Sequence, residues 1–242
     1  MSEAYPIHLR PSAPLAPRVL LPGDPHRALA TAQAILEEPR MFNHARGLWG
    51  YTGRGRDGDL LTVQSTGIGG PSAAIVVEEL IALGARTLVR IGTCGALVGD
   101  LAMGELVVAR SAIGADGTSR ALGVDGTVEA DAPLTDALAG GPVAGRGRYR
   151  EVTAVTTDLF YEERREVTRA SWVDAGAKVV EMETATLLAL ARRRGVAAGA
   201  LLAVTDLLTG GERTRMGREE MEGLGARLGE AAWSALDAGD RY

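Results

Sequence analysis

Short apolar runs alternate along the chain with longer stretches in which apolar residues recur every three or four positions. The short runs predict strands, and the longer stretches predict helices with one apolar face. The predicted strands cover residues 18–21, 60–64, 87–91, 105–109, 152–155, 178–180 and 200–204, and the predicted helices cover residues 28–36, 71–83, 184–194 and 218–238. This alternation of strands and helices is typical of an α/β fold.

Glycine and proline positions support the predicted helix boundaries. Pro71 falls in a first helical turn, where its missing N–H costs nothing, and Gly84 and Gly195 follow the last apolar positions of two helices. Residues 114–147 are rich in glycine, aspartate and alanine with little periodicity, so we expect a surface loop there with one short helix at 133–138. The chain has no internal repeat and no linker, and its length suits one domain, residues 1–242.

Most of the predicted strands are followed within two residues by glycine, a hydroxyl residue or a charged residue. Such residues follow the strands that end near positions 21, 64, 91, 155, 180 and 204. In α/β sheets, ligands bind outside the carboxyl ends of the strands, where loops and helix N-termini converge. These polar strand ends together predict one shared polar cleft.

Two arginines point to an anion site in this cleft. Arg90 interrupts an otherwise apolar strand, and a buried guanidinium is costly unless it is paired. Its planar fork suits a carboxylate or a phosphate, and the glycines beside Thr93 would let backbone N–H groups approach the same anion. Arg27 lies in a first helical turn after Gly23, where it opposes the helix dipole and needs another reason to be there. A structural ion pair with a core carboxylate is the alternative for Arg90.

Carboxylates follow two further strands. Glu181, Met182 and Glu183 lie at a strand-to-helix junction, where the acids either favour the helix dipole or accept hydrogen bonds from the vicinal hydroxyls of a sugar. Asp206 ends an apolar run, and burial favours the protonated form of a carboxyl group, which can then act as a general acid. A cap on the following turn is the alternative for Asp206.

The composition argues against several classes of protein. The net charge of −5 disfavours non-specific binding to nucleic acid or anionic membranes, and no apolar run reaches the roughly 18 residues of a membrane span. The first 17 residues have no continuous apolar core, so we expect no signal peptide, and the single cysteine, Cys94, fits a reducing, cytoplasmic compartment. Lys178 is the only lysine, which excludes a P-loop ATPase, and three histidines without spaced cysteines predict no metal site. A dehydrogenase is disfavoured because Ser72 stands where a dinucleotide-binding turn needs its third glycine.

Several of these segments resemble the purine nucleoside and uridine phosphorylase family, in its hexamer-forming branch. Residues 65–80, Ser-Thr-Gly-Ile-Gly-Gly-Pro-Ser-Ala-Ala-Ile-Val-Val-Glu-Glu-Leu, are similar to the family signature. The other similar segments are, in order, residues 21–25, 46–47, 89–93, 158–161, 181–183 and 205–206. The resemblance implies a single α/β domain with a central mixed β-sheet, partly barrel-like and flanked by helices.

The resemblance also implies roles for the polar residues of the cleft. The implied phosphate site comprises Gly23, Arg27, Arg46, Arg90 and Thr93, and the implied nucleoside site comprises His8, Phe160, Glu181, Met182 and Glu183. Arg46 and His8 would come from neighbouring subunits, so we expect a homo-oligomer, a hexamer built as a trimer of dimers. The implied reaction is displacement at the anomeric carbon through an oxocarbenium-like state, with Asp206 donating a proton to purine N7. Inorganic phosphate is then a co-substrate, and no cofactor is expected.

Two departures from the family pattern favour purine over pyrimidine nucleosides. Uridine phosphorylases carry Gln-x-Arg after the Phe-Tyr pair, whereas residues 162–166 here are Glu-Glu-Arg-Arg-Glu, and those enzymes lack the acid that Asp206 represents. The purine enzymes place an arginine where this chain has Glu219. The arginine that assists Asp206 is therefore expected among Arg213, Arg215 and Arg218, and we assign the role to Arg218.

Two other functions of the same fold, nucleoside hydrolysis and nucleoside binding without catalysis, fit these residues less well than phosphorolysis. A phosphate-independent nucleosidase would not need Arg27, Arg46 and Arg90 together, and a non-catalytic nucleoside-binding protein would not need an acid at position 206. Phosphorolysis of purine nucleosides is therefore the expected activity. Uridine phosphorolysis and nucleoside hydrolysis remain the alternatives.

Overall fold

The computed structural model describes residues 6–141, 148–161, 165–209 and 213–237. Its elements, in chain order, are β1 (Arg18–Leu21), α1 (Pro25–Ile35), β2 (Glu37–Asn43), the 3-10 turn η1 (Ala45–Gly47), β3 (Gly50–Arg54), β4 (Leu60–Gln64), α2 (Gly70–Leu83), β5 (Thr87–Ala96), β6 (Leu106–Gly114), α3 (Gly117–Ala121), β7 (Thr127–Glu129), α4 (Ala132–Ala139), β8 (Arg150–Thr156), α5 (Arg165–Asp174), β9 (Val179–Glu181), α6 (Thr184–Arg194), β10 (Ala197–Leu207), β11 (Thr214–Arg215), α7 (Arg218–Glu222) and α8 (Leu224–Asp237). Strands and helices alternate, as the apolar pattern predicts, and the described strands belong to one sheet.

Five strands of this sheet close into a ring. β10 pairs in parallel with β5 and antiparallel with β6, while β6 and β9 both pair in parallel with β8. β9 then returns antiparallel to β5 and completes the ring. β1, β4, β3 and β2 extend the sheet outward from β5, with β1 parallel to both of its neighbours. The predicted α/β fold with a mixed, partly barrel-like sheet is confirmed.

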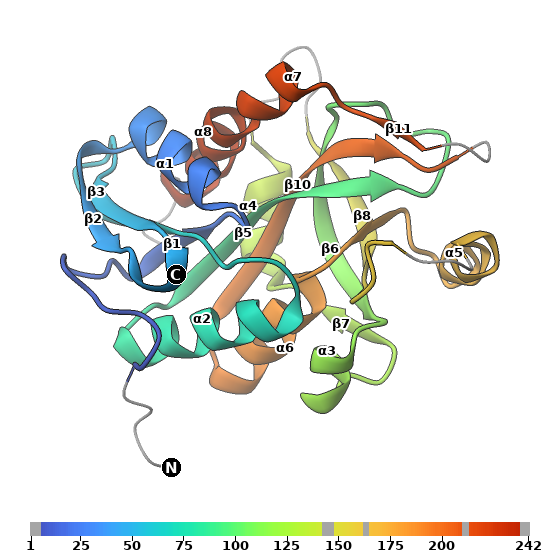
Figure 1. Ribbon diagram of the computed structural model, residues 1–242, viewed down its shortest axis with the longest axis horizontal. Helices are drawn as coiled ribbons and strands as arrows, with labels where there is room; N and C mark the ends of the chain where they lie inside the picture. Colours follow the sequence, from blue (N-terminus) through green and yellow to red (C-terminus); the bar gives the residue numbers. More distant parts are fainter. Residues whose placement is uncertain (1–5, 142–147, 162–164, 210–212, 238–242) are drawn as a thin grey trace.

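Helices cover the sheet on two sides (Figure 1). α1, α4 and α8 pack together on one side, and α2 packs beside α6 on the other. The first group buries residues such as Ala28, Leu134 and Leu228 in one apolar cluster, and the second buries Val77 and Leu188 in another. Because both faces are covered, the central strands are apolar on both sides, and a charged residue within them needs its own explanation.

Several predicted boundaries agree with the structure. The strands 18–21 and 60–64 and the helix 184–194 begin and end where the pattern predicts. Gly84 and Gly195 end α2 and α6 in the left-handed region, with φ of 118° and 67°, which confirms them as helix stops. The single helix predicted for 218–238 is wrong, because α7 ends at Glu222 with Gly223 as its C-cap and α8 begins at Leu224; residue 238 lies outside the described residues.

The sequence pattern missed several elements. β2 contains Pro39 and is exposed at five of its seven positions, so it lacks the alternation that predicts a strand. β3 includes Gly53, where an added Cβ would lie only 2.6 Å from the carbonyl oxygen of Glu37. Residues 114–141 hold α3 and β7 as well as the predicted short helix, α4, while 142–147 lie outside the described residues. α5 was not predicted.

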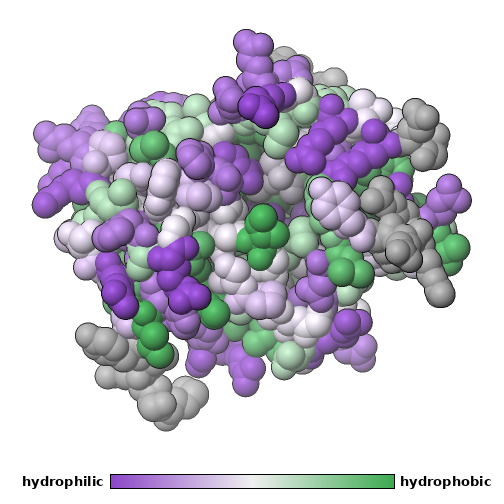
Figure 2. Space-filling view, in the orientation of Figure 1, coloured by the Kyte–Doolittle hydropathy of each residue, from purple (hydrophilic) through white to green (hydrophobic). Residues whose placement is uncertain are grey.

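The surface combines hydrophilic side chains with separate apolar ones. Figure 2 shows hydrophobic residues as isolated spots on a mainly hydrophilic face. The most exposed large apolar side chains of the described residues are Ile68 and Tyr161 at 79 %, Val167 at 78 % and Ile7 at 72 %. Within the described ranges, no helix has the length and apolar character needed to cross a membrane.

Candidate active site

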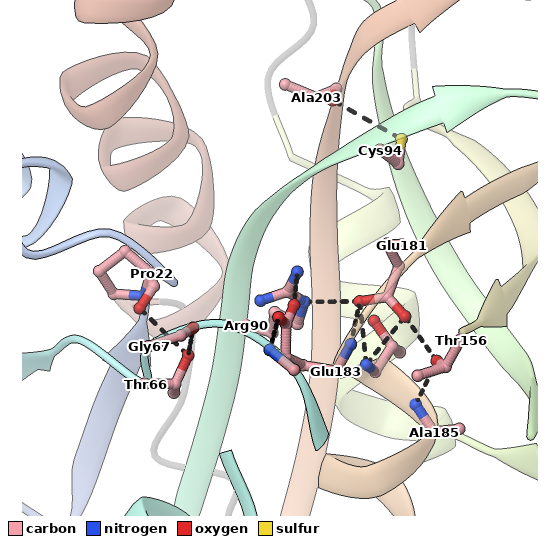
Figure 3. A network of polar contacts seen from close by, with 12 residues as sticks. Pro22, Thr66, Gly67, Arg90, Cys94, Thr156, Glu181, Glu183, Ala185 and Ala203 are labelled. Carbon is pink, nitrogen blue, oxygen red and sulfur yellow. Dashed lines mark hydrogen bonds and ion pairs between the residues drawn. The ribbon is translucent and has the colours of Figure 1, made fainter. Parts of the chain in front are cut away.

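Polar strand ends meet around Arg90 of β5. In the sheet register, Arg90 lies beside Leu21 at the end of β1 and beside Ala200 of β10. Glu181 ends β9, and Glu183 is the N-cap residue of α6. Figure 3 shows both carboxylates next to the Arg90 side chain. Within the predicted polar cleft, Arg90, Glu181 and Glu183 therefore form a compact charged cluster.

Arg90 forms two buried ion pairs. Its Nε donates to Oε2 of Glu181 at 2.9 Å, and its Nη2 lies 2.5 Å from Oε2 of Glu183. Burial alone would lower the pKa of Arg90, but the charges of Glu183 and Glu181 outweigh burial and raise it. A Cβ on Gly92 would lie 2.8 Å from Cζ of Arg90, so a glycine is needed for the guanidinium to lie there. The ion pair weighed as an alternative for Arg90 is thus present.

Contacts within the chain occupy the whole carboxylate of Glu181. Besides Arg90, it accepts hydrogen bonds from the Thr156 hydroxyl at 2.5 Å, from the backbone N–H of Glu183 at 2.9 Å and from that of Thr184 at 2.9 and 3.0 Å. The side chain has 0 % exposure. Nucleoside binding by Glu181 stays a prediction. In this structure Glu181 positions Arg90 and the start of α6 and offers no free oxygen to a ligand.

Glu183 is held from two directions. Its Oε1 accepts a hydrogen bond from the backbone N–H of Gly69 at 2.5 Å, opposite the contact of Oε2 with Arg90. Gly69 lies in the turn before α2 with φ of 85°, a conformation that favours glycine. Burial raises the pKa of Glu183, and the charge of Arg90 opposes that effect. Met182, which lies between the two glutamates in the sequence, is half-buried.

Arg27 supplies a second guanidinium near Arg90. Asp24 caps α1 and accepts a hydrogen bond from the backbone N–H of Arg27 at 2.9 Å, which fixes the arginine in the first turn. Burial, and then the positive charge of Arg90, lower the pKa of Arg27. Nη1 of each arginine is buried with no hydrogen-bond partner among the described residues. Gly23 adjoins this position, since a Cβ there would lie 3.7 Å from Nη2 of Arg27.

Two buried, unpartnered N–H groups on neighbouring cations are unusual, because buried polar groups in proteins nearly always have a partner. A guanidinium binds oxyanions through charge-assisted hydrogen bonds. The pair Arg27 and Arg90 is therefore a suitable site for a phosphate-like anion.

Two further residues of the predicted phosphate site lie on different elements. Thr93 is half-buried on β5, beside Ala203 of β10. Arg46 is exposed in η1 with φ of 59°, a left-handed conformation that is uncommon for a residue with a side chain. Such conformations cluster at functional sites. Phosphate binding by Thr93 and Arg46 stays a prediction.

The predicted general acid, Asp206, lies near the end of β10 with its side chain 9 % exposed. Nε of Arg213 donates to Oδ1 at 2.7 Å. The Thr205 hydroxyl is within hydrogen-bond distance of Oδ2, at 3.0 Å, and of the carbonyl oxygen of Cys94, at 3.4 Å. Both oxygens of Asp206 therefore have defined positions.

The arginine that contacts Asp206 in this structure is Arg213, while the assignment of the assisting role to Arg218 stays a prediction. β11 pairs antiparallel with β10, with Arg215 opposite Asp206, and this hairpin returns the chain to the carboxylate. Nε of Arg215 lies 3.9 Å from Oδ1, whereas Arg218 comes after the hairpin and begins α7. The spacing along the chain could not distinguish the three arginines, because the strand pairing decides which one returns.

Arg213 also contacts the residue predicted to flank the base. Its Cζ lies 4.2 Å from the centroid of the Phe160 ring, and Cζ of Arg215 lies 5.7 Å from it. Phe160 is 41 % exposed and packs edge-on against Tyr161, with the ring centroids 5.0 Å apart. Arg213 thus links the predicted acid to the predicted base-binding ring. Residues 162–164, part of the segment compared with uridine phosphorylases, lie outside the described residues.

His8 lies at a different place in the same chain. Its Nδ1 is 2.7 Å from Oε1 of Glu79 on α2, and Glu79 also accepts hydrogen bonds from the backbone N–H groups of Ile7, His8 and Leu9. These contacts anchor the start of the described chain to α2. The role of His8 in a neighbouring subunit stays a prediction.

Comparison with known proteins assigns a family to this arrangement. The sequence profile of the Phosphorylase superfamily matches residues 17–237. The chain belongs to this superfamily. It is 40 % identical over 203 residues to a DeoD-type purine nucleoside phosphorylase of Caldanaerobacter subterraneus subsp. tengcongensis, covering 83 % of this chain and 87 % of that protein. Proteins of the same name from Geobacillus kaustophilus and Bacillus cereus are 37 % identical over 210 residues and 38 % identical over 204 residues. These alignments cover 86 % and 83 % of this chain, and 88 % and 86 % of the two relatives. The predicted family is confirmed.

Proposed function

We propose that this member of the Phosphorylase superfamily is a purine nucleoside phosphorylase. It cleaves a purine nucleoside with inorganic phosphate and releases the free base and a pentose 1-phosphate. The observation that carries the proposal is the pair of buried, unpartnered N–H groups on Arg27 and Arg90, which suits an oxyanion. The names of the relatives support the choice of purine nucleosides.

The reaction is a displacement at C1′ of the sugar. A phosphate oxygen forms a bond to C1′ while the bond from C1′ to N9 breaks, and the electron pair of the broken bond passes to the base. Asp206, in its protonated form, donates its proton to N7, so the base leaves as a neutral molecule. The bound phosphate dianion stabilises the positive charge that develops on the sugar. Arg27 and Arg90 bind this phosphate, together with Gly23, Thr93 and the partner subunit's Arg46.

The remaining residues hold the nucleoside. Glu183 accepts hydrogen bonds from the 2′- and 3′-hydroxyls, Met182 packs on the sugar, and Phe160 flanks the base. The partner subunit's His8 reaches the 5′-hydroxyl. Arg213, in place of Arg218, assists Asp206, because its contacts with Asp206 and Phe160 let it orient the acid beside the base.

Phosphate is a co-substrate in this proposal, and the protein needs no other cofactor. Arginine side chains supply the positive charge that binds it. A phosphate-independent nucleosidase would leave the unpartnered donors of Arg27 and Arg90 without a use.

We further propose a homohexamer, a trimer of dimers, that acts in the cytoplasm and binds neither nucleic acid nor membrane. The family resemblance motivates this assembly, because its implied site takes His8 and Arg46 from neighbouring subunits. A monomer in sedimentation would contradict both roles.

The test is base release from inosine, adenosine and uridine, each with and without inorganic phosphate. We expect a purine base and a pentose 1-phosphate only when phosphate is present. Preferential cleavage of uridine would keep the phosphate site but overturn the base assignment. Release without phosphate would identify a nucleosidase. The Arg27→Met variant, which removes one guanidinium from the site, should need more phosphate to reach the same rate.

A further inference from the structure

Two side chains that bind different substrates in the proposed function form an ion pair with each other. Arg90, assigned to phosphate, contacts Glu183, assigned to the sugar, with 2.5 Å between Nη2 and Oε2. Their side chains are 6 % and 8 % exposed, so little water screens the pair. The contact occupies the oxygen of Glu183 that Gly69 leaves available. In this ion pair, Nη2 of Arg90 is less available to phosphate, and Oε2 of Glu183 is less available to a sugar hydroxyl.

The three donor groups of Arg90 differ in how they are held. Nε is fixed by Glu181, whose carboxylate is itself fixed by Thr156 and by the backbone of residues 183–184. Nη2 contacts Glu183, and Nη1 has no partner in the described structure. Figure 3 shows Glu181 and Glu183 beside the guanidinium. Glu181 thus anchors one edge of the guanidinium while the other edge can exchange partners.

A phosphate dianion competes with Glu183 for that other edge. It carries more negative charge than a carboxylate, and the nearby Arg27 adds a second cation. Hydrogen bonds from phosphate to Nη1 and Nη2 would weaken the hold of Arg90 on Oε2 of Glu183. That oxygen could then accept a hydrogen bond from a sugar hydroxyl. In the opposite direction, a sugar that engages Glu183 makes Nη2 available to phosphate.

We propose that the Arg90–Glu183 ion pair couples the phosphate and sugar subsites, so that each ligand strengthens the binding of the other. The proposal rests on the proposed function. Such coupling is reciprocal, because the same free energy appears in both binding equilibria. Glu181 is the positioning residue of this device and touches neither ligand.

The experiment measures binding without turnover. The probe is a purine C-nucleoside, in which a carbon–carbon bond joins base and sugar and resists phosphorolysis. Its dissociation constant is measured by titration calorimetry on the wild-type protein without phosphate and with saturating inorganic phosphate. We expect binding at least about fivefold tighter with phosphate, the lower end of ordinary coupling between sites. The affinity for phosphate should rise by the same factor when the C-nucleoside is saturating.

The Glu183→Gln variant separates this exchange from a direct contact between phosphate and sugar. It keeps the shape of the side chain but removes the charge that holds Arg90. We expect the variant to bind phosphate alone more tightly than wild type does, and its coupling factor to fall close to one. Glu78→Gln, which removes a half-buried carboxylate that pairs with Arg194, is the matched control and should keep the wild-type coupling.

Each other outcome overturns a specific statement. If both ligands bind wild type with a coupling factor of one, the coupling is absent while the proposed function stands. If Glu183→Gln keeps the wild-type factor, the coupling comes from direct contact between the ligands, and the ion-pair exchange is wrong. If wild type binds no phosphate, the proposed function fails and the coupling fails with it.

Discussion

Arg27 is expected to reduce the stability of the protein until an anion binds beside it. Its Nη1 is buried without a partner in the described structure, and the charge of Arg90 disfavours a second cation nearby. A buried polar group left without a hydrogen bond costs about 1–3 kcal/mol, and we take the lower value because the residue is only half-buried. Replacing Arg27 with methionine keeps most of the apolar stem and removes the charge.

The Arg27→Met variant should therefore be more stable than wild type in phosphate-free buffer, by about 1 kcal/mol. For a chain of this length, 1 kcal/mol corresponds to a rise of roughly 2–4 °C in the unfolding midpoint. Inorganic phosphate at about 100 times its Kd should stabilise wild type by about 2.7 kcal/mol. The variant loses charge-assisted hydrogen bonds worth about 1.5–3 kcal/mol, so the same phosphate concentration should stabilise it by about 1 kcal/mol or less.

The assay is thermal unfolding of both proteins over a series of phosphate concentrations. The order of stability should reverse, with the variant more stable at zero phosphate and wild type more stable at high phosphate. Arg193→Met, which removes an exposed arginine from α6, is the control for the loss of one charge and should respond to phosphate as wild type does. The reasoning would be refuted if Arg27→Met were less stable than wild type without phosphate and phosphate stabilised both proteins by the same amount.

Three further predictions concern the acid, its arginine and the N-terminal anchor. Asp206→Asn should lower kcat on purine nucleosides by about 10²–10⁴, the usual contribution of a general acid, and an unchanged kcat would remove Asp206 from that role. Arg213→Ala should lower kcat about tenfold or more while Arg218→Ala stays within about twofold; the reverse order in steady-state kinetics would restore Arg218. Burial alone would raise the pKa of Glu79, but hydrogen bonds from Leu9, His8 and Ile7 outweigh it and lower the pKa below the ordinary 4.5. The contribution of Glu79 to anchoring residues 7–9 is therefore present above pH 4.5 and is lost as the pH falls through the lowered value. Amide exchange of these residues, corrected for the intrinsic rate, should accelerate in that range, and protection that does not change with pH would contradict the prediction.

Much of the fold was predictable because it depends on local signals. Apolar runs ended by glycine mark β1, β4 and the helices that follow them, and Gly84 and Gly195 stop their helices through their own conformational freedom. β2 and β3 escaped prediction because their pairing with each other, and not their apolar pattern, makes them strands. The closure of five strands into a ring likewise depends on pairings between segments far apart in the chain.

The candidate site divides in the same way. The sequence by itself determined that Arg90, Glu181, Glu183 and Asp206 follow or interrupt apolar strands, and an unusual charge in such a place is visible without coordinates. It could not determine the partner of each charge. Only the tertiary structure decided that Glu181 is fully engaged, that Arg90 bridges to Glu183, and that the arginine on Asp206 is Arg213. The physical reason is that ion pairs depend on distances of a few ångströms between side chains, and strand register and chain reversal set those distances, whereas spacing along the sequence does not.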